Sequence, residues 1–160
     1  MISGILVIAA NNVVDYKFHS IYVYNFTKYI EWPTPAPEFR IHILGGNANI
    51  LDTFKSMAES KQVSGSKITV KQFSNINSLT TECDIVFVPN SESSVAAKVI
   101  DKFKGKSTLV ITEKNGLCES GSCINFVLVD NRLKFEINKS AIDQAGLKVS
   151  AQLLQMGIEK

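Results

Sequence analysis

The run Asp84-Ile-Val-Phe-Val88, closed by Pro89, has four consecutive apolar residues. A short run without alternating polar residues is typical of a strand that is buried on both faces, in the middle of a parallel sheet. Proline ends such a run because it has no N–H to give to a neighbouring strand. We therefore predict a central strand here and assign the rest of the chain outward from it.

Further helices and strands alternate on both sides of this central run, which is typical of an α/β fold with a parallel sheet. Apolar residues three and four positions apart predict the helices, and short apolar or alternating runs predict the strands. The expected helices cover 15–32, 49–60 and a segment from Ser91 or Ser94 to Phe103, and the expected strands cover 39–44, 68–73 and 108–112. Asp15 is the expected N-cap of the first helix, and the proline-rich segment 33–37 ends that helix.

The alternation of predicted helices and strands ends after residue 112. Two strand-like runs, 123–129 and 132–138, are separated by Asp130-Asn131, a dipeptide that favours a tight turn. They predict a C-terminal antiparallel hairpin at one edge of a mostly parallel sheet. The last segment, 139–156, has a helical pattern that Gly146 interrupts.

Length and charge narrow the class of protein. A chain of 160 residues is long enough for one domain with a proper core. The 17 basic and 15 acidic residues leave a net charge of +2, without a basic cluster. Nucleic acid is therefore not an expected partner, because sustained phosphate contact needs a clustered basic stripe. The chain has no run of about 20 apolar residues that could span a bilayer.

The N-terminal residues 2–10 are mostly apolar and lead into Asn11. They resemble the end of the apolar region of a signal peptide, with a cleavage site after Ala9 or Ala10. In this interpretation residues 1–10 are a signal-peptide remnant and the exported protein begins near Asn11. The alternative is an edge strand rich in β-branched residues.

Three cysteines bear on whether the protein is exported or cytosolic. Cys118 and Cys123 enclose a flexible four-residue loop that can bring two Cα atoms within disulfide range. Cys83 starts an apolar run and is expected to be a small core residue. One bridge and one buried thiol fit an exported protein, although a cytosolic protein with three free thiols fits the count almost as well.

Two turns are candidates for binding a small ligand, because they follow predicted parallel strands. They are Gly45-Gly46-Asn47 and Pro89-Asn90-Ser91. The complete glycine pattern of a dinucleotide site is absent, and so is the lysine of a phosphate-binding loop, so a purely structural turn is the stronger reading. No cofactor is implied.

Catalytic and metal-binding constellations are not evident in the sequence. His42 lies in a predicted strand and is expected to be a satisfied sheet histidine rather than a base. His19, on the first helix, is expected at the surface or facing a partner, and Glu113 is expected to be solvated. We therefore do not expect an enzyme.

The first predicted helix is unusually aromatic, with Tyr22, Tyr24, Phe26 and Trp32 along its length. One interpretation is a core helix whose tyrosine hydroxyls reach water. The other is a contact surface for a partner protein, where aromatic residues are enriched.

Three segments together resemble the YfiR-like family. They are Ile21-Tyr-Val-Tyr-Asn-Phe-Thr-Lys-Tyr-Ile-Glu-Trp-Pro33, Cys83-Asp-Ile-Val-Phe-Val-Pro89, and Ile124 to Asn138 followed by Ala145-Gly-Leu-Lys-Val-Ser150 and Leu153-Leu154. Their order and spacing match as well. The resemblance covers 16–157, and the expected family domain covers 15–157.

The resemblance implies an exported bacterial protein with a Rossmann-like α/β sandwich. It also implies a periplasmic repressor that binds an inner-membrane diguanylate cyclase, or another sensor protein, and so restrains cyclic-di-GMP output and biofilm formation. The family's structural disulfide sits where Cys118 and Cys123 lie. The family signature carries no catalytic residues, and three cysteines cannot form two redox-active bridges.

The leading hypothesis is thus a regulatory module that acts by binding a membrane protein, and self-association into a homodimer is left open. The alternative is a periplasmic sensor or carrier of a small ligand that uses the two turns.

Overall fold

A computed structural model describes residues 15–34 and 36–160. An eight-stranded, mostly parallel sheet runs through the molecule, with strand order β10-β8-β7-β6-β5-β2-β4-β3. Its strands are β2 (Glu38–Leu44), β3 (Gln62–Val63), β4 (Ser66–Phe73), β5 (Ile85–Val88), β6 (Leu109–Thr112), β7 (Ile124–Val129), β8 (Arg132–Ile137) and β10 (Ile158–Glu159). The predicted fold class is confirmed: α/β with a C-terminal antiparallel hairpin, β7–β8.

The predicted central strand lies in the middle of this sheet. All four residues of β5 are buried, and β5 pairs in parallel with β2 on one side and with β6 on the other. Ile43, Phe87, Ile111 and Ile124 pair in succession across four strands. Because paired residues point to the same face, they form one buried apolar row.

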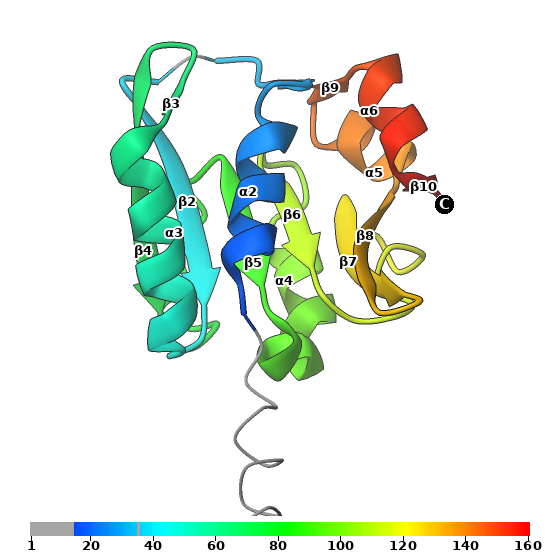
Figure 1. Ribbon diagram of the computed structural model, residues 1–160, viewed down its shortest axis with the longest axis horizontal. Helices are drawn as coiled ribbons and strands as arrows, with labels where there is room; N and C mark the ends of the chain where they lie inside the picture. The colour runs from blue at the N-terminus through cyan, green and yellow to red at the C-terminus, as the bar shows by residue number, and fades with distance from the viewer. Residues whose placement is uncertain (1–14, 35) are drawn as a thin grey trace, which may run out of the picture.

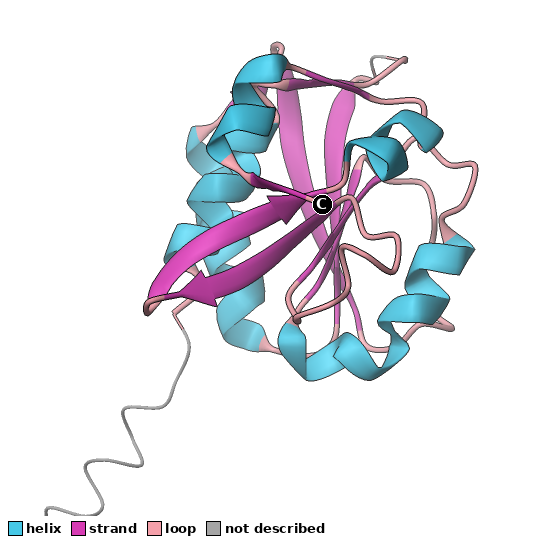
Figure 2. Cartoon of the chain, turned by 90° about the vertical axis from the view of Figure 1, so that its right-hand side faces the viewer, coloured by secondary structure: helices cyan, strands magenta, loops and turns pink. Residues whose placement is uncertain are grey.

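Helices cover both faces of the sheet (Figure 2). On one face lie α2 (Lys17–Phe26) and α3 (Ala48–Ser60), whose Phe54 stacks on Phe87 of β5 with ring centroids 5.5 Å apart. On the other face lie a 3-10 segment, η1 (Asn90–Val95), and α4 (Ala96–Lys102). In Figure 1, α2 and α3 stand side by side in front of the strands.

The first helix is shorter than predicted. Residues 15–32 were expected to be helical, but α2 ends at Phe26, and Thr27, Lys28 and Tyr29 each bond the carbonyl three residues back. The chain then forms β1 (Ile30–Glu31). Tertiary pairing overrides the helical pattern here, because β1 pairs with β9 (Lys148–Val149) and buries Ile30. At the start of α2, Asp15 accepts the Lys17 N–H at 2.9 Å, although the flanking N-cap position is Tyr16.

The C-terminal segment is also broken more than predicted. The helical pattern of 139–156 divides into α5 (Lys139–Gln144), β9 and α6 (Ala151–Met156). Gly146 ends α5 with a φ of 74°, a value that glycine adopts at little cost. Ser150 then caps α6 by accepting the Leu153 N–H.

Within 15–34 and 36–160, no helix has both the length and the apolar character needed to cross a membrane. The expected signal-peptide remnant, residues 1–10, lies outside the described residues.

Candidate functional site

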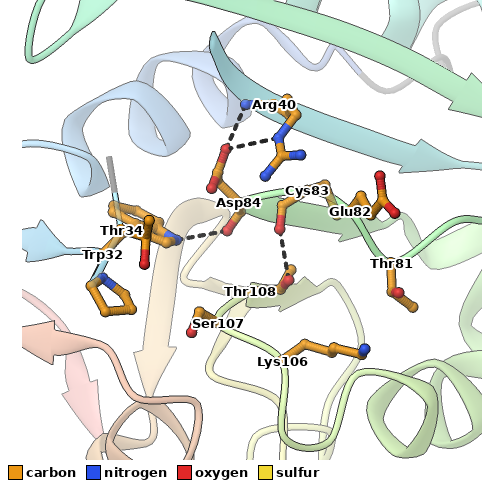
Figure 3. A pocket seen from close by; sticks show the side chains of 11 residues that line it. Trp32, Thr34, Arg40, Thr81, Glu82, Cys83, Asp84, Lys106, Ser107 and Thr108 are labelled. Carbon is orange, nitrogen blue, oxygen red and sulfur yellow. Dashed lines mark hydrogen bonds and ion pairs between the residues drawn. The ribbon is translucent and has the colours of Figure 1, made fainter. Parts of the chain in front are cut away.

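A cavity of about 190 Å³ opens at the amino edge of the parallel sheet, beside Trp32 (Figure 3). It is built by the chain just after β1, by Arg40 of β2, and by the loops that lead into β5 and β6. A second cavity, of about 280 Å³, shares Trp32, Thr34 and Asp84 with it. Trp32 therefore stands between two hollows.

Asp84 organises the wall of the first cavity. Its Oδ2 accepts the Arg40 backbone N–H at 2.8 Å and lies 3.5 Å from Arg40 Nε. Its backbone carbonyl accepts the Trp32 indole N–H at 2.9 Å, and Thr108 bonds the neighbouring Cys83 carbonyl at 2.7 Å. The indole ring also meets Phe39 edge-on, with centroids 4.9 Å apart. Trp32 is thus held rigidly at the mouth of the cavity.

The two turns predicted to bind a ligand lie at the opposite, carboxyl edge, and the parallel pairing of β2 with β5 brings them together. A Cβ on Gly45 would lie 2.9 Å from Glu92 Cγ, so a protein side chain already packs against this turn. Asn47 caps α3 by accepting the Ile50 N–H. Gly46, Asn90 and Ser91 are exposed. Ligand binding at these turns stays a prediction, while the cavities above are lined by other residues.

A buried polar cluster lies at the carboxyl edge, at residues that the sequence pattern predicted to be exposed. His19 is only 5% exposed, so the expected surface position is wrong, and its Nε2 lies 2.5 Å from Glu113 Oε2. The other carboxylate oxygen of Glu113 accepts the Tyr16 hydroxyl at 2.7 Å and the Asn90 N–H at 2.9 Å. Glu113 is therefore not freely solvated either. Pattern alone could not find this contact, because Tyr16 and Glu113 are 97 positions apart.

The electrostatics of Glu113 follow from these contacts. Burial favours its neutral form, but the contact with His19 and the hydrogen bonds from Asn90 and Tyr16 favour the carboxylate more, so that its pKa is lowered. The pKa of Tyr16 is raised, first by burial and then by the adjacent Glu113. His19 Nδ1 is buried and has no hydrogen-bond partner among the described residues.

His42 is a sheet histidine, as its position in a strand suggested. It is buried in β2, its Nδ1 lies 3.1 Å from the Thr80 carbonyl oxygen, and its ring packs on Phe73. Burial lowers its pKa. In the part of the chain that the structure describes, no group of three or more His, Cys, Asp or Glu side chains is arranged to hold a metal ion.

This chain matches a known protein family. A family model described as YfiR/HmsC-like matches residues 16–158, nearly all of the chain. The chain belongs to this family. Proteins of the YfiR/HmsC-like family are periplasmic and regulate diguanylate cyclase signalling rather than catalysing a reaction.

The aromatic residues of the family's N-terminal signature take different roles here. Phe26 is 1% exposed and belongs to the core. Tyr22 packs its ring on Phe126 and Phe135, while Tyr24 lies under the ammonium groups of two lysines. Trp32 follows β1 instead of lying on the helix. Only the half-buried Tyr22, Tyr24 and Trp32 could contact a partner from the native fold.

The exposed apolar residues lie elsewhere. Phe18 and Ile21 of α2 are 63% and 45% exposed, and Leu128 of β7 is 71% exposed. Phe18, Ile21 and Tyr22 have the three- and four-residue spacing that predicts one apolar, buried face of the helix. That prediction is wrong for Phe18 and Ile21, because His19 and Val23 face the core instead.

These exposed residues lie at one end of the same face. Phe18 precedes Tyr22 by one helical turn, and Leu128 follows Phe126 on the same side of β7. Tyr22 and Phe126 are in ring contact. Phe18, Ile21 and Leu128 form what we call the α2–hairpin patch.

The cysteines of this family member are buried free thiols in the structure. Cys118 Sγ donates to the Ser122 carbonyl at 3.6 Å. Burial raises the pKa of the Cys118 thiol to about 12 and that of Cys123 to about 11. The expected bridge is therefore not formed here and stays a prediction for the oxidised protein. Cys83 is a buried core residue, as predicted.

Proposed function

We propose that this chain is a periplasmic repressor that binds the periplasmic part of an inner-membrane diguanylate cyclase, or of a related sensor protein, and holds it inactive. The single observation that carries the proposal is the YfiR/HmsC-like match over residues 16–158.

Repression of this kind needs only a difference in affinity. A protein that binds the inactive state of the cyclase more tightly than the active state shifts the equilibrium between them. A difference of about 1–3 kcal/mol changes the population ratio roughly 5- to 150-fold. One surface with a few well-packed apolar contacts can supply that difference.

The α2–hairpin patch is the surface that we assign to the cyclase. Large apolar side chains that lie this open to water and close together mark interaction sites more often than isolated ones do. Tyr22, half-buried at the edge of the patch, adds an aromatic ring of the type that is enriched at interfaces. Tyr24 and Trp32 lie farther along the chain and contribute less in this arrangement.

The test measures cyclic-di-GMP in the native cell. Deletion of the gene is expected to raise the cyclic-di-GMP level, and the wild-type chain to restore it. The double variant Phe18→Ser, Leu128→Ser should accumulate in the periplasm and unfold at the wild-type temperature, yet fail to restore the low level. Met156→Ser is the matched control, because Met156 is also half exposed, at 52%, but lies on α6.

Two results would distinguish an error in the surface assignment from an error in the repressor function. Full repression by the patch variant would remove the surface assignment while leaving the repressor function. An unchanged cyclic-di-GMP level after deletion, in a cell that expresses the protein, would remove the function itself.

A further inference from the structure

The family match assigns no role to the cavity beside Trp32. Four separate segments meet there, at the amino ends of β5 and β6. Its volume of about 190 Å³ lies below the 300–1,000 Å³ that is usual for drug-sized ligands. Any molecule that enters it is therefore small.

Two cations line this cavity without being fully paired. The Asp84 carboxylate takes the backbone N–H of Arg40 and faces its Nε, and Nε is buried without a hydrogen bond of its own within the described residues. In Figure 3 the dashed lines reach these two nitrogens, and the two terminal nitrogens of the guanidinium carry none. Lys106, on the other side of the cavity, is exposed and forms no ion pair with a described residue.

The remaining polar groups at the cavity divide clearly into used and free. The Trp32 indole N–H and the Thr108 hydroxyl are already bonded to backbone carbonyls. Ser107 is exposed, and its hydroxyl has no hydrogen bond to any described residue. The Glu82 carboxylate also lines the cavity and is exposed, as Lys106 is, so that water screens both charges. The groups without a partner among the described residues are the terminal nitrogens of Arg40, the Lys106 ammonium and the Ser107 hydroxyl. The free acceptors that oppose them are the Glu82 carboxylate and Oδ1 of Asp84, while the hydroxyls of Thr34 and Thr81 can donate or accept.

From this arrangement we infer that the cavity binds a small organic carboxylate. The carboxylate oxygens accept from the terminal nitrogens of Arg40 and from Lys106, since charge-assisted hydrogen bonds of this kind are the strong ones. The organic part lies against the Trp32 ring, which its own hydrogen bond and the edge-on contact with Phe39 hold in place. This site is separate from the α2–hairpin patch and does not depend on the proposed repression.

The chain contains one tryptophan, and that tryptophan lines the cavity. Tryptophan fluorescence therefore reports on Trp32 and on the two cavities that it lines, and the Lys106 variant distinguishes them because Lys106 lines only the first. Acetate, succinate and benzoate are titrated into the purified protein at constant ionic strength, with inorganic phosphate and the neutral benzamide as comparisons, and calorimetry is run in parallel. We expect saturable binding of at least one carboxylate, with a change in Trp32 emission, and no binding of benzamide.

Lys106→Gln is the decisive variant, because Lys106 is exposed and its loss does not disturb the core. It should weaken carboxylate binding about tenfold at low salt, the effect of losing one charge-assisted contact. Lys102→Gln is the matched control: Lys102 is an exposed lysine of α4 that does not line the cavity, and its replacement should leave binding unchanged.

Each other outcome overturns the inference. If neither fluorescence nor calorimetry detects binding of any of the three carboxylates, the cavity does not bind this class of ligand. Binding of phosphate alone would replace it with an inorganic anion. Equal binding of benzoate and benzamide, or wild-type affinity in Lys106→Gln, would show that the cations do not recognise the ligand.

Discussion

The imidazole of His19 and the carboxylate of Glu113 meet in the interior, with Nε2 2.5 Å from Oε2, and so join the first helix to the end of β6. Tyr16 and the Asn90 backbone N–H bond the other oxygen of the same carboxylate. Three segments that are distant in sequence are thereby tied together at the carboxyl edge of the sheet.

Glu113→Gln is expected to destabilise the protein at pH 7 by about 1–3 kcal/mol, because it replaces a charged acceptor of buried hydrogen bonds with a neutral one. The lowered pKa of Glu113 adds a pH dependence. A carboxyl whose pKa is lowered by folding contributes stability above its unfolded value, near 4.5, and loses that contribution as the pH falls through the folded value. The difference between wild type and variant should therefore shrink below about pH 4.5.

Urea unfolding at pH 7 and at a series of lower pH values measures this difference. Glu119→Gln is the control, since Glu119 is exposed and accepts no hydrogen bond from a described residue. A gap between wild type and Glu113→Gln that stays constant down to pH 3 would contradict the assigned role of the carboxylate.

Gly45 and Gly46, at the end of β2, give a second prediction in which Gly46 serves as the control for Gly45. Gly45 has a φ of 103°, and an added Cβ would lie 2.9 Å from Glu92 Cγ. Gly45→Ala should therefore cost about 1–2 kcal/mol of unfolding free energy. Gly46 has no heavy atom within 4 Å of an added Cβ and no positive φ, so Gly46→Ala should be neutral or slightly stabilising.

Thermal unfolding of the two variants tests the structural role of this turn. If the turn is structural, only Gly45→Ala shifts the midpoint. Equal effects of the two substitutions on stability would refute the packing of Glu92 against this turn.

Sequence patterns predicted the parts of the fold that depend on local apolar content. The run at Ile85–Val88 is buried on both faces because helices lie on both sides of it, and its composition shows this directly. The end of α2 could not be predicted in the same way. Ile30 continues the helical spacing, but pairing with Val149, more than a hundred residues later, makes it a strand residue.

The site residues also depend on contacts between segments that are distant in sequence, which local patterns do not predict. The carboxyl edge was the reasonable place to expect a ligand in a parallel α/β sheet, yet Glu92 and Glu113 supply side-chain partners there. The Trp32 cavity depends on four separate segments, three loops and strand β2, and no single segment predicts that they converge. Phe18 has the spacing of a core residue but is exposed, because the hairpin packs against the face of α2 that carries His19, Tyr22 and Phe26.

Tyr22 and Tyr24 form a matched pair for a third prediction. The Tyr22 hydroxyl donates to the Leu133 carbonyl at 3.2 Å, so Tyr22→Phe should cost about 0.5–1.5 kcal/mol while the ring contacts remain. The Tyr24 hydroxyl has no hydrogen bond to a described residue, and Tyr24→Phe should leave the unfolding free energy unchanged. Chemical denaturation measures both. A loss of stability in Tyr24→Phe equal to that in Tyr22→Phe would show that the Leu133 bond is not the cause.

The cysteines give the last prediction. Cys118 and Cys123 are buried, and their raised pKa values of about 12 and about 11 make the free thiols poor nucleophiles at neutral pH. Thiol reagents should therefore label the folded, reduced protein slowly and the unfolded protein fast. In protein taken from an oxidising compartment we expect one Cys118–Cys123 bridge, seen as a loss of two hydrogens in the intact mass.

A bridge across so short a loop constrains the unfolded chain only modestly and should add less than about 3 kcal/mol. Reduction should then lower the unfolding midpoint of the wild type and of Cys83→Ser, but not that of the double variant Cys118→Ser, Cys123→Ser. Cys83 serves as the control because it is buried in the core and has no bridging partner in this pairing. Three free thiols in protein isolated without reductant would eliminate the bridge, and would leave Ser122 as the partner that holds Cys118 in place.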